Sequence, residues 1–477
     1  IPGKCRRVGL DGCVLIALSL VMALQLSACG KEGKTSSEND TKQGGTSSVG
    51  EPVRVKEDGM LFETRKVDNP DITMLIFWDP MEDINEINAL YKKIYGGNVE
   101  VLVKAWGQKA SLIASYAASG TKAEIVMLSK TDFPVMSASG VLEEIDLAKL
   151  DSNSEYWNIN NMKNLTSING KNYGLCFNNL NIVSTPLILF NKKIFSEFGQ
   201  KTPLEYFREN AWNWDNFRKT AASLTMDKDG DGKTDLYGYD VSLAGAPGYL
   251  MESNGAEPLK YTDNTFSLNL NDPRVLAAYQ LYSDMYNVDK SICTTEFKEY
   301  SNFLNGKTAM TTIAINQMAQ LYADGMEAGS IGFAPFPSGP AAQGKHFANY
   351  EGHLIVGSVK GTGNTDATLA WMECAVSVWN KLALDSPPEI TSYLYNDEEK
   401  AVIKEINAKT VKYEDSGLKY TADGSYGTRY INTCFLTAQE MVYKIRENLP
   451  LSTVMEQYKP TLQGYLDAAN ELLKTAK

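Results

Sequence analysis

The chain has 477 residues and a formal net charge of −12 at pH 7, without a block of basic residues that would favour binding to nucleic-acid phosphates. Its two histidines, His346 and His353, are predicted to lie in loops and form no HExxH motif. Most zinc chemistry and most serine or cysteine nucleophile schemes are therefore excluded.

The N-terminal segment has the layout of a secretory signal. Basic residues among the first seven precede an apolar run over residues 14–26, which is shorter than the ~20 residues of a membrane-spanning helix. We predict a signal peptide over residues 1–28, with a plain transmembrane anchor or an uncleaved signal as the alternative. Leu26-Ser27-Ala28-Cys29 resembles the bacterial lipobox, which implies that Cys29 is lipidated and anchors the protein to the extracellular face of the cell membrane.

Residues 29–58 are predicted to form a flexible tether that begins with the lipidated cysteine. Beyond Cys29 the segment is rich in glycine, serine, threonine and charged or amide residues, so it cannot bury enough apolar surface to fold. The body that follows is longer than the ~250–300 residues that one core usually holds, which predicts two lobes.

The body begins with alternating strands and helices. Buried strands are predicted at 72–78, 99–104 and 123–128, with one helix ending near Tyr95 and another at about 111–119. This order predicts a parallel sheet, and ligands of such sheets bind beyond the carboxyl ends of the strands. The residues expected on this rim are Trp78, Asp79, Trp106, Ser129 and Thr131.

A second set of elements starts with a hairpin signal at Asn169-Gly170, because Asn-Gly tolerates the positive φ angles of a type I′ turn. A buried strand at 187–190 follows, and Asp215 is predicted as the N-cap of a later helix. Gly306-Lys307-Thr308 looks like the end of a phosphate-binding loop but lacks its first glycine, so we interpret it as a helix end that leads into a strand at 308–312.

An acidic loop in this second set has the spacing of a calcium loop. Aspartates stand at loop positions 1, 3, 5 and 9, with a glycine at position 6, and this alternation directs oxygens onto one hard cation. Gly238 replaces the glutamate of position 12, which predicts weaker binding or a ligand from elsewhere. A calcium ion here would be structural, no other cofactor is required, and a solvated acidic turn is the alternative. The predicted ligands are Asp227, Asp229, Asp231, Lys233 and Asp235.

Aromatic and polar residues near the predicted strand ends and in loops suit a sugar, which offers apolar C–H faces and many hydroxyl groups. Each of them taken alone is more often a core or surface residue than a ligand contact. The full set of candidate ligand-binding residues adds Asn178, Tyr249, Asn316, Tyr350 and Glu351 to the five rim residues named above. Trp371 and Trp379, within an apolar helix at 367–384, are instead interpreted as packing residues.

With these pieces placed, the chain over about residues 70–477 resembles the extracellular solute-binding proteins of bacterial carbohydrate ABC importers, the group that includes maltose-binding protein. The motifs that carry the resemblance, beside Cys29, are Ile168-Asn169-Gly170-Lys171-Asn172-Tyr173-Gly174, Leu189-Phe190-Asn191-Lys192, Trp214-Asp215-Asn216-Phe217, Asp235-Leu236-Tyr237-Gly238 and Phe303-Leu304-Asn305-Gly306-Lys307-Thr308-Ala309-Met310.

The resemblance implies a two-lobed α/β fold of the periplasmic-binding-protein type, with a hinge and a ligand cleft between the lobes. Lobe 1 would take residues 70–156 and 352–410, and lobe 2 residues 157–351 and 411–477. The implied function is capture of a mono- or oligosaccharide by a monomer and its delivery to the subunits of an ABC permease. Closure on a ligand that contacts both lobes would present a new surface to that permease.

Two other functions stay open at this point. A secreted glycan-active hydrolase would need two carboxylates facing one cleft, whereas adjacent residues such as Glu143-Glu144 on a strand would point in opposite directions. We therefore name no catalytic residue and expect no enzyme. A surface glycan-adhesion protein is the second alternative. The cysteines beyond Cys29 show no CxxC spacing and are predicted to be unpaired and buried: Cys176, Cys293, Cys374 and Cys434.

Overall fold

The structure is a computed structural model. It describes residues 53–57, 60–64, 66–77, 83–105, 108–129, 132–133, 135–149, 166–175, 186–241, 246–293, 300–314, 318–327, 329–347, 354–385, 396–411 and 440–475. The predicted signal peptide and lipidation site, Cys29, lie outside these ranges. Within them, none of the helices combines the length and the apolar character that crossing a membrane requires.

The end of the predicted tether forms a β-hairpin instead. Strand β1 (Val53–Glu57) pairs antiparallel with β2 (Met60–Thr64), so the expected boundary at residue 58 is too late. The valines of β1 alternate with charged residues, which is the period-two pattern of a strand, and Asp58-Gly59 between the strands is a strong hairpin dipeptide. This signal is short and follows a long polar segment, so composition alone does not reveal it.

The first sheet has the strand order β16-β5-β3-β4. Its first three strands along the sequence are parallel, as predicted, and β16 runs antiparallel to β5. Their bounds are β3 (Ile72–Ile76), β4 (Val99–Val103), β5 (Ile125–Ser129) and β16 (Leu354–Gly357). The associated helices are α2 (Asp83–Tyr95), α3 (Lys109–Ser119), α4 (Val135–Ala138), the 3-10 turn η3 (Leu147–Lys149) and α13 (Thr365–Asp385).

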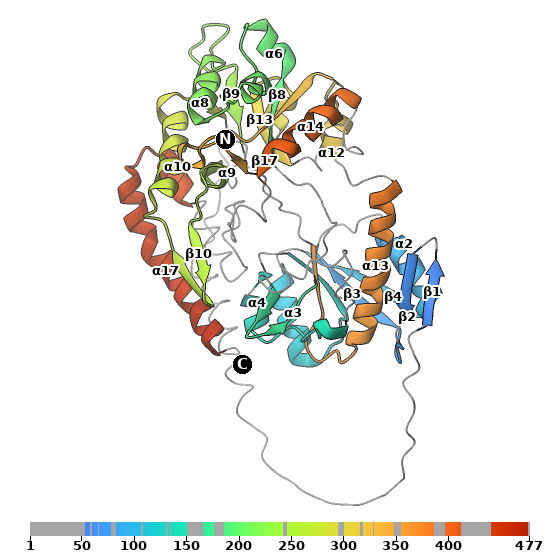
Figure 1. The fold of residues 1–477 in the computed structure, drawn as a ribbon. Helices are drawn as coiled ribbons and strands as arrows, with labels where there is room; N and C mark the ends of the chain where they lie inside the picture. Colours follow the sequence, from blue (N-terminus) through green and yellow to red (C-terminus); the bar gives the residue numbers. More distant parts are fainter. Residues whose placement is uncertain are drawn as a thin grey trace, which may run out of the picture. The chain divides into compact units, whose positions relative to one another are not determined.

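The first core forms from two distant parts of the sequence. Helix α13 packs against α2, and Figure 1 shows it in orange beside the blue elements of the first sheet. Trp371 of α13 is fully buried, and its Nε1 donates to Asn88 Oδ1 over 2.8 Å. The prediction that Trp371 is a packing residue is therefore confirmed, while the side chain of Trp379 is beyond what the structure describes.

The second sheet has the strand order β12-β9-β13-β8-β14. Strands β9, β12 and β13 run parallel, whereas β8 is antiparallel to both of its neighbours. Their bounds are β8 (Pro186–Asn191), β9 (Tyr237–Asp240), β12 (Ile292–Cys293), β13 (Thr308–Ala314) and β14 (Ile331–Pro335). The predicted strand after Gly306-Lys307 is thus confirmed as β13.

Many helices share the second core. Their bounds are α6 (Lys192–Glu197), α7 (Pro203–Arg208), α8 (Trp214–Ser223), α9 (Ala246–Ser253), α10 (Pro273–Ser283), the π-helical turn η5 (Asp284–Val288), α11 (Ser301–Leu304), α12 (Met318–Ala323), α14 (Asp397–Lys409) and α17 (Leu451–Thr475). In Figure 1 the red helix α17 runs beside β10 (Leu259–Thr262), which pairs with β11 (Thr265–Leu268), and the contacts of α17 with β11 agree.

Two of these helices differ from expectation. The N-cap of α8 is Asn213, whose Oδ1 accepts from Asn216 N over 3.0 Å, so the prediction of Asp215 as N-cap is wrong. Asp215 lies in the first turn, where its charge suits the positive end of the helix dipole. Helix α14 buries Val402 and Ile406 in the second core, whereas residues 352–410 were expected in the first lobe.

Short hairpins and turns complete the described fold. In the hairpin of β6 (Ser167–Ile168) and β7 (Lys171–Asn172), both Asn169 and Gly170 have positive φ, which confirms the type I′ signal. The remaining elements are β10 (Leu259–Thr262), β11 (Thr265–Leu268), the 3-10 turn η7 (Pro340–Ala342), β15 (His346–Phe347) and β17 (Thr410–Val411).

The histidine and cysteine predictions have mixed outcomes. His346 is not a loop residue, because it is buried in β15 and its Nδ1 lies 2.8 Å from Phe336 O; burial lowers its pKa. Cys374 is free and buried, and Cys293 is free but only half-buried, with its pKa raised to about 11 mainly by burial. His353, Cys176 and Cys434 fall in segments that the structure does not describe.

Replacing glycine with alanine should have opposite effects at two positions. A Cβ on Gly238 of β9 would lie 1.9 Å from the backbone oxygen of Ala221, whereas a Cβ on Gly464 of α17 meets nothing within 4 Å. Gly238→Ala should therefore lower the free energy of unfolding by ~1–3 kcal/mol, and Gly464→Ala should raise it by ~0.5–1 kcal/mol. Urea unfolding of the two variants tests this, and equal effects at both positions would contradict the close packing of α8 on β9.

Candidate functional site

The carboxyl edge of the first sheet carries the first group of candidate residues. Ser129 is the last residue of β5, and it pairs with Leu354, the first residue of β16. The chain therefore enters β16 at the same edge at which β5 ends. Ser129 is the one candidate of this group within the described backbone; those outside the described residues are Trp78, Asp79, Trp106, Thr131, Tyr350 and Glu351.

The second sheet presents a corresponding edge. Strand β9 ends at Asp240, which is fully buried, and β13 ends at Ala314, which pairs with Pro186 at the start of β8. The candidate Tyr249 follows on α9, where its half-buried ring packs against Phe336 at a centroid distance of 5.7 Å. The candidates Asn178 and Asn316 are in parts of the chain that the structure does not describe.

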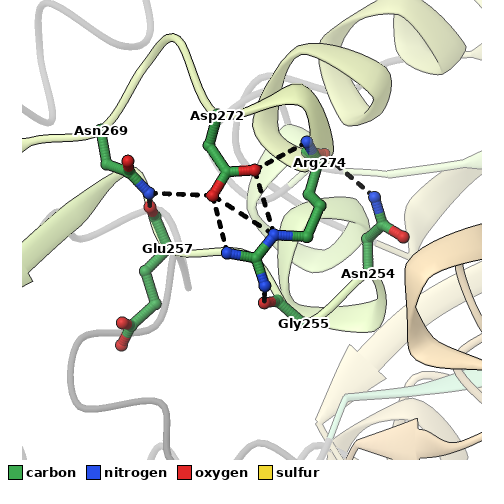
Figure 2. Close-up of polar contacts among 6 residues, drawn as sticks. All are labelled: Asn254, Gly255, Glu257, Asn269, Asp272 and Arg274. Carbon is green, nitrogen blue, oxygen red and sulfur yellow. Dashed lines mark hydrogen bonds and ion pairs between the residues drawn. The ribbon is translucent and has the colours of Figure 1, made fainter.

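A polar network supports the end of α9, the helix that carries Tyr249 (Figure 2). Asp272 caps α10 and accepts from the Arg274 guanidinium at 2.6–3.3 Å, while Arg274 Nη1 donates to Gly255 O over 2.6 Å. Asn254 Nδ2 donates to Arg274 O over 3.1 Å. The chain after α9 is thus tied to the start of α10. The side-chain hydrogen bonds from Arg274 hold the pKa of Asp272 well below its usual range.

The acidic loop folds so that three of its aspartates converge. Carboxylate oxygens of Asp227, Asp229 and Asp235 all lie within 4.8 Å of one another. The ends of the loop are held by the backbone pairing of Met226 with Leu236. Asp231 takes another direction, because its carboxylate accepts from the Lys233 amide at 2.8 Å and lies 3.3 Å from the Lys233 ammonium.

The backbone of the loop surrounds Asp227 with donors. Its Oδ1 accepts from Gly230 N and its Oδ2 from Gly232 N, each over 2.7 Å. These bonds, with that from Gly232 the largest cause, lower the pKa of Asp227. The carboxylate therefore stays ionised over a wider pH range, as a hard cation requires.

The missing glutamate at loop position 12 has a structural cause. Position 12 is Gly238, which lies in β9 against the backbone of α8 and leaves no space for a side chain. The sequence showed the substitution but not this reason, because the contact depends on how α8 packs on β9. Any bound ion must then be held by the oxygens of the remaining loop positions.

One charged pair at the first edge was not found by sequence reasoning. Lys109 begins α3 and Asp132 follows β5, and their Nζ and Oδ2 atoms lie 2.5 Å apart with both side chains fully buried. Single lysines and aspartates are common on surfaces, so neither residue gives a signal of burial on its own. The proximity of each to a predicted strand end is the only clue that the sequence offers.

Comparison with known families gives a match over most of the chain. The family described as bacterial extracellular solute-binding protein matches residues 78–378. A search among curated proteins gave no significant match.

Solved structures with the same fold are distant in sequence. UgpB from Mycobacterium tuberculosis in complex with glycerophosphocholine has a TM-score of 0.60 at 15% identity, over 83% of this chain and 98% of that chain. The sugar-binding protein MalE from Xanthomonas citri has a TM-score of 0.58 at 16% identity, over 85% and 97%. The GacH receptor of Streptomyces glaucescens, solved unliganded and with acarbose, has a TM-score of 0.57 at 16% identity, over 85% and 99%. These similarities establish the periplasmic-binding-protein fold.

Acidic pH should weaken the Asp272–Arg274 interaction, which ties the chain after α9 to the start of α10. Because the pKa of Asp272 is lowered in the folded state, its contribution is complete above its unfolded pKa of ~3.9 and is lost as the pH falls below that value. Asp272→Asn should therefore lower the free energy of unfolding by ~1 kcal/mol at pH 7, since the partly exposed Arg274 is screened by water. Urea unfolding at pH 7 and pH 3 should show the difference shrinking in acid. Asp263→Asn, in the exposed β10–β11 turn, is the control.

We propose that the acidic loop binds calcium through Asp227, Asp229 and Asp235, with Asp231 and the backbone carbonyl of Lys233 as further candidates. Calcium should raise the melting temperature by a few degrees relative to a chelator, because an ion that binds only the folded state stabilises it. Magnesium should act more weakly, since it demands octahedral geometry and keeps its waters. Asp227→Asn combined with Asp229→Asn should abolish the effect. Identical melting curves in calcium and in chelator would show a solvated acidic turn.

Proposed function

The chain belongs to the family of bacterial extracellular solute-binding proteins, and from this premise we propose that it captures a mono- or oligosaccharide and delivers it to an ABC permease. The observation that carries the choice of sugar is the fold it shares with the sugar-binding MalE and with GacH, which was solved with acarbose. The aromatic and polar candidates at the strand ends suit a ligand with flat apolar faces and many hydroxyl groups.

The two sheets give this proposal a physical mechanism. In an open α/β sheet the ligand binds beyond the carboxyl ends of the strands, and this chain has two such edges. A solute that contacts residues at both edges would favour a closed state by its differential affinity for that state. Closure about a hinge would then present a new surface to the permease. Binding and release suffice for this role, so we propose that the protein is not an enzyme.

We also propose where the protein acts. The predicted signal peptide over residues 1–28 and a lipid on Cys29 would place a monomer on the extracellular face of the cell membrane. The tether after Cys29 would leave the two-lobed body mobile near the permease.

A thermal unfolding screen tests the solute. The mature chain, residues 29–477, should melt at a higher temperature with one class of mono- or oligosaccharide, by about 2.7 kcal/mol of stabilisation when the sugar is at 100 times its Kd. Mass spectrometry should recover that sugar intact. The panel should include glycerophosphocholine, because UgpB was solved with it.

Each alternative predicts a different result. Cleaved sugar would indicate a hydrolase, and tight binding to whole polymer without compaction in solution scattering would indicate an adhesion protein. A shift with glycerophosphocholine alone would replace sugar as the solute while leaving the binding role in place.

A further inference from the structure

We infer that the buried ion pair Lys109–Asp132 is a positioning element of the first sheet's ligand edge, an inference that rests on the proposed solute-binding function. Both side chains are almost completely removed from solvent, and the Nζ–Oδ2 distance is 2.5 Å. The pair joins two segments that each follow directly on a strand of the sheet.

The location of the pair relative to the strands is specific. Lys109 follows the end of β4 by six residues, and Asp132 follows the end of β5 by three. Strands β4 and β5 are the two neighbours of β3 in the sheet. The ion pair therefore connects the segments on both sides of β3, at the edge where β3 itself ends.

Stability alone does not account for such a pair. Removing two charges from water costs about as much as their attraction returns, and apolar residues of similar volume are often as stable or more stable. Apolar packing is already present in these segments, because Ile113 of α3 and Phe133 beside Asp132 are fully buried in the first core. The pair adds something that such contacts do not, which is a fixed distance and direction between the two segments.

The sequence shows why this fixed geometry matters for a solute. The candidate Trp106 precedes Lys109 by three residues, and the candidate Thr131 immediately precedes Asp132. A binding site loses affinity when its groups are free to shift by even small distances, so supporting residues have to hold them in place. An ammonium and a carboxylate buried together resist such a shift, because separating them would lose their attraction where little water is present to replace it.

The test replaces the pair by apolar residues of similar size. The double variant K109M/D132L should keep the melting temperature within a few degrees of the wild type, or raise it, but should weaken the Kd of the sugar found in the screen at least tenfold. Hydrogen exchange without sugar should also become faster at the backbone amides of residues 104–110 and 129–135. The matched control is K149M/D366L, an exposed lysine–aspartate pair with an Nζ–Oδ1 distance of 2.9 Å. Its Asp366 lies in the first turn of α13, the helix that follows the opposite end of β16.

Unchanged affinity together with unchanged exchange in the double variant would overturn the inference and leave the pair a purely structural contact. If the wild type binds no member of the panel, the proposed function fails, and the exchange measurement still decides the role of the pair: faster exchange confined to those amides supports positioning, and equal exchange refutes it. K109Q/D132N, which keeps polar groups of similar shape, replaces the apolar variant if that variant does not fold.

Discussion

The pairing of β16 with β5 is the constraint on which the first half of the fold depends. These strands lie in distant parts of the sequence, and all strands of the second sheet fall between them. The first core therefore joins residues from both sides of those strands in the sequence, since α13, which follows β16, supplies Trp371 and its neighbours to that core. The same pairing brings the start of β16 to the edge where β5 ends, so a single register places two chain segments beside one candidate site.

Local chemistry was predictable wherever one short segment decides the structure. The parallel strands β3, β4 and β5 follow from buried runs separated by helices, and the type I′ hairpin follows from Asn169-Gly170. Errors arose where neighbours in space decide. Asn213 rather than Asp215 caps α8, and His346 is buried in β15, a strand that pairs with the distant β17. Of the candidate sugar-binding side chains, Tyr249 is described and packs partly against Phe336, so the ligand contacts stay a prediction.

The acidic loop shows how packing limits binding chemistry. Its spacing predicted carboxylates around one cation, and the structure brings Asp227, Asp229 and Asp235 together. In the loops with full calcium affinity, position 12 supplies two oxygens, but here that position is Gly238 within β9, pressed against α8. Because a strand follows this loop, position 12 lies where β9 packs closely on α8, and no side chain that could bind the ion fits there. Any calcium would be held more weakly and would serve to fix the connection between α8 and β9.

The ion pairs near the two candidate edges differ in their exposure to water. At the first edge the Lys109–Asp132 pair is buried, so dissolved salt hardly screens it and its geometry has little freedom. At the second edge the support of α9 depends on Arg274, which remains 42% exposed, and on several shared hydrogen bonds to Asp272 and the backbone. Water and ions weaken such a pair. The ion pair at the first edge should therefore depend less on salt than the Asp272–Arg274 pair that supports α9.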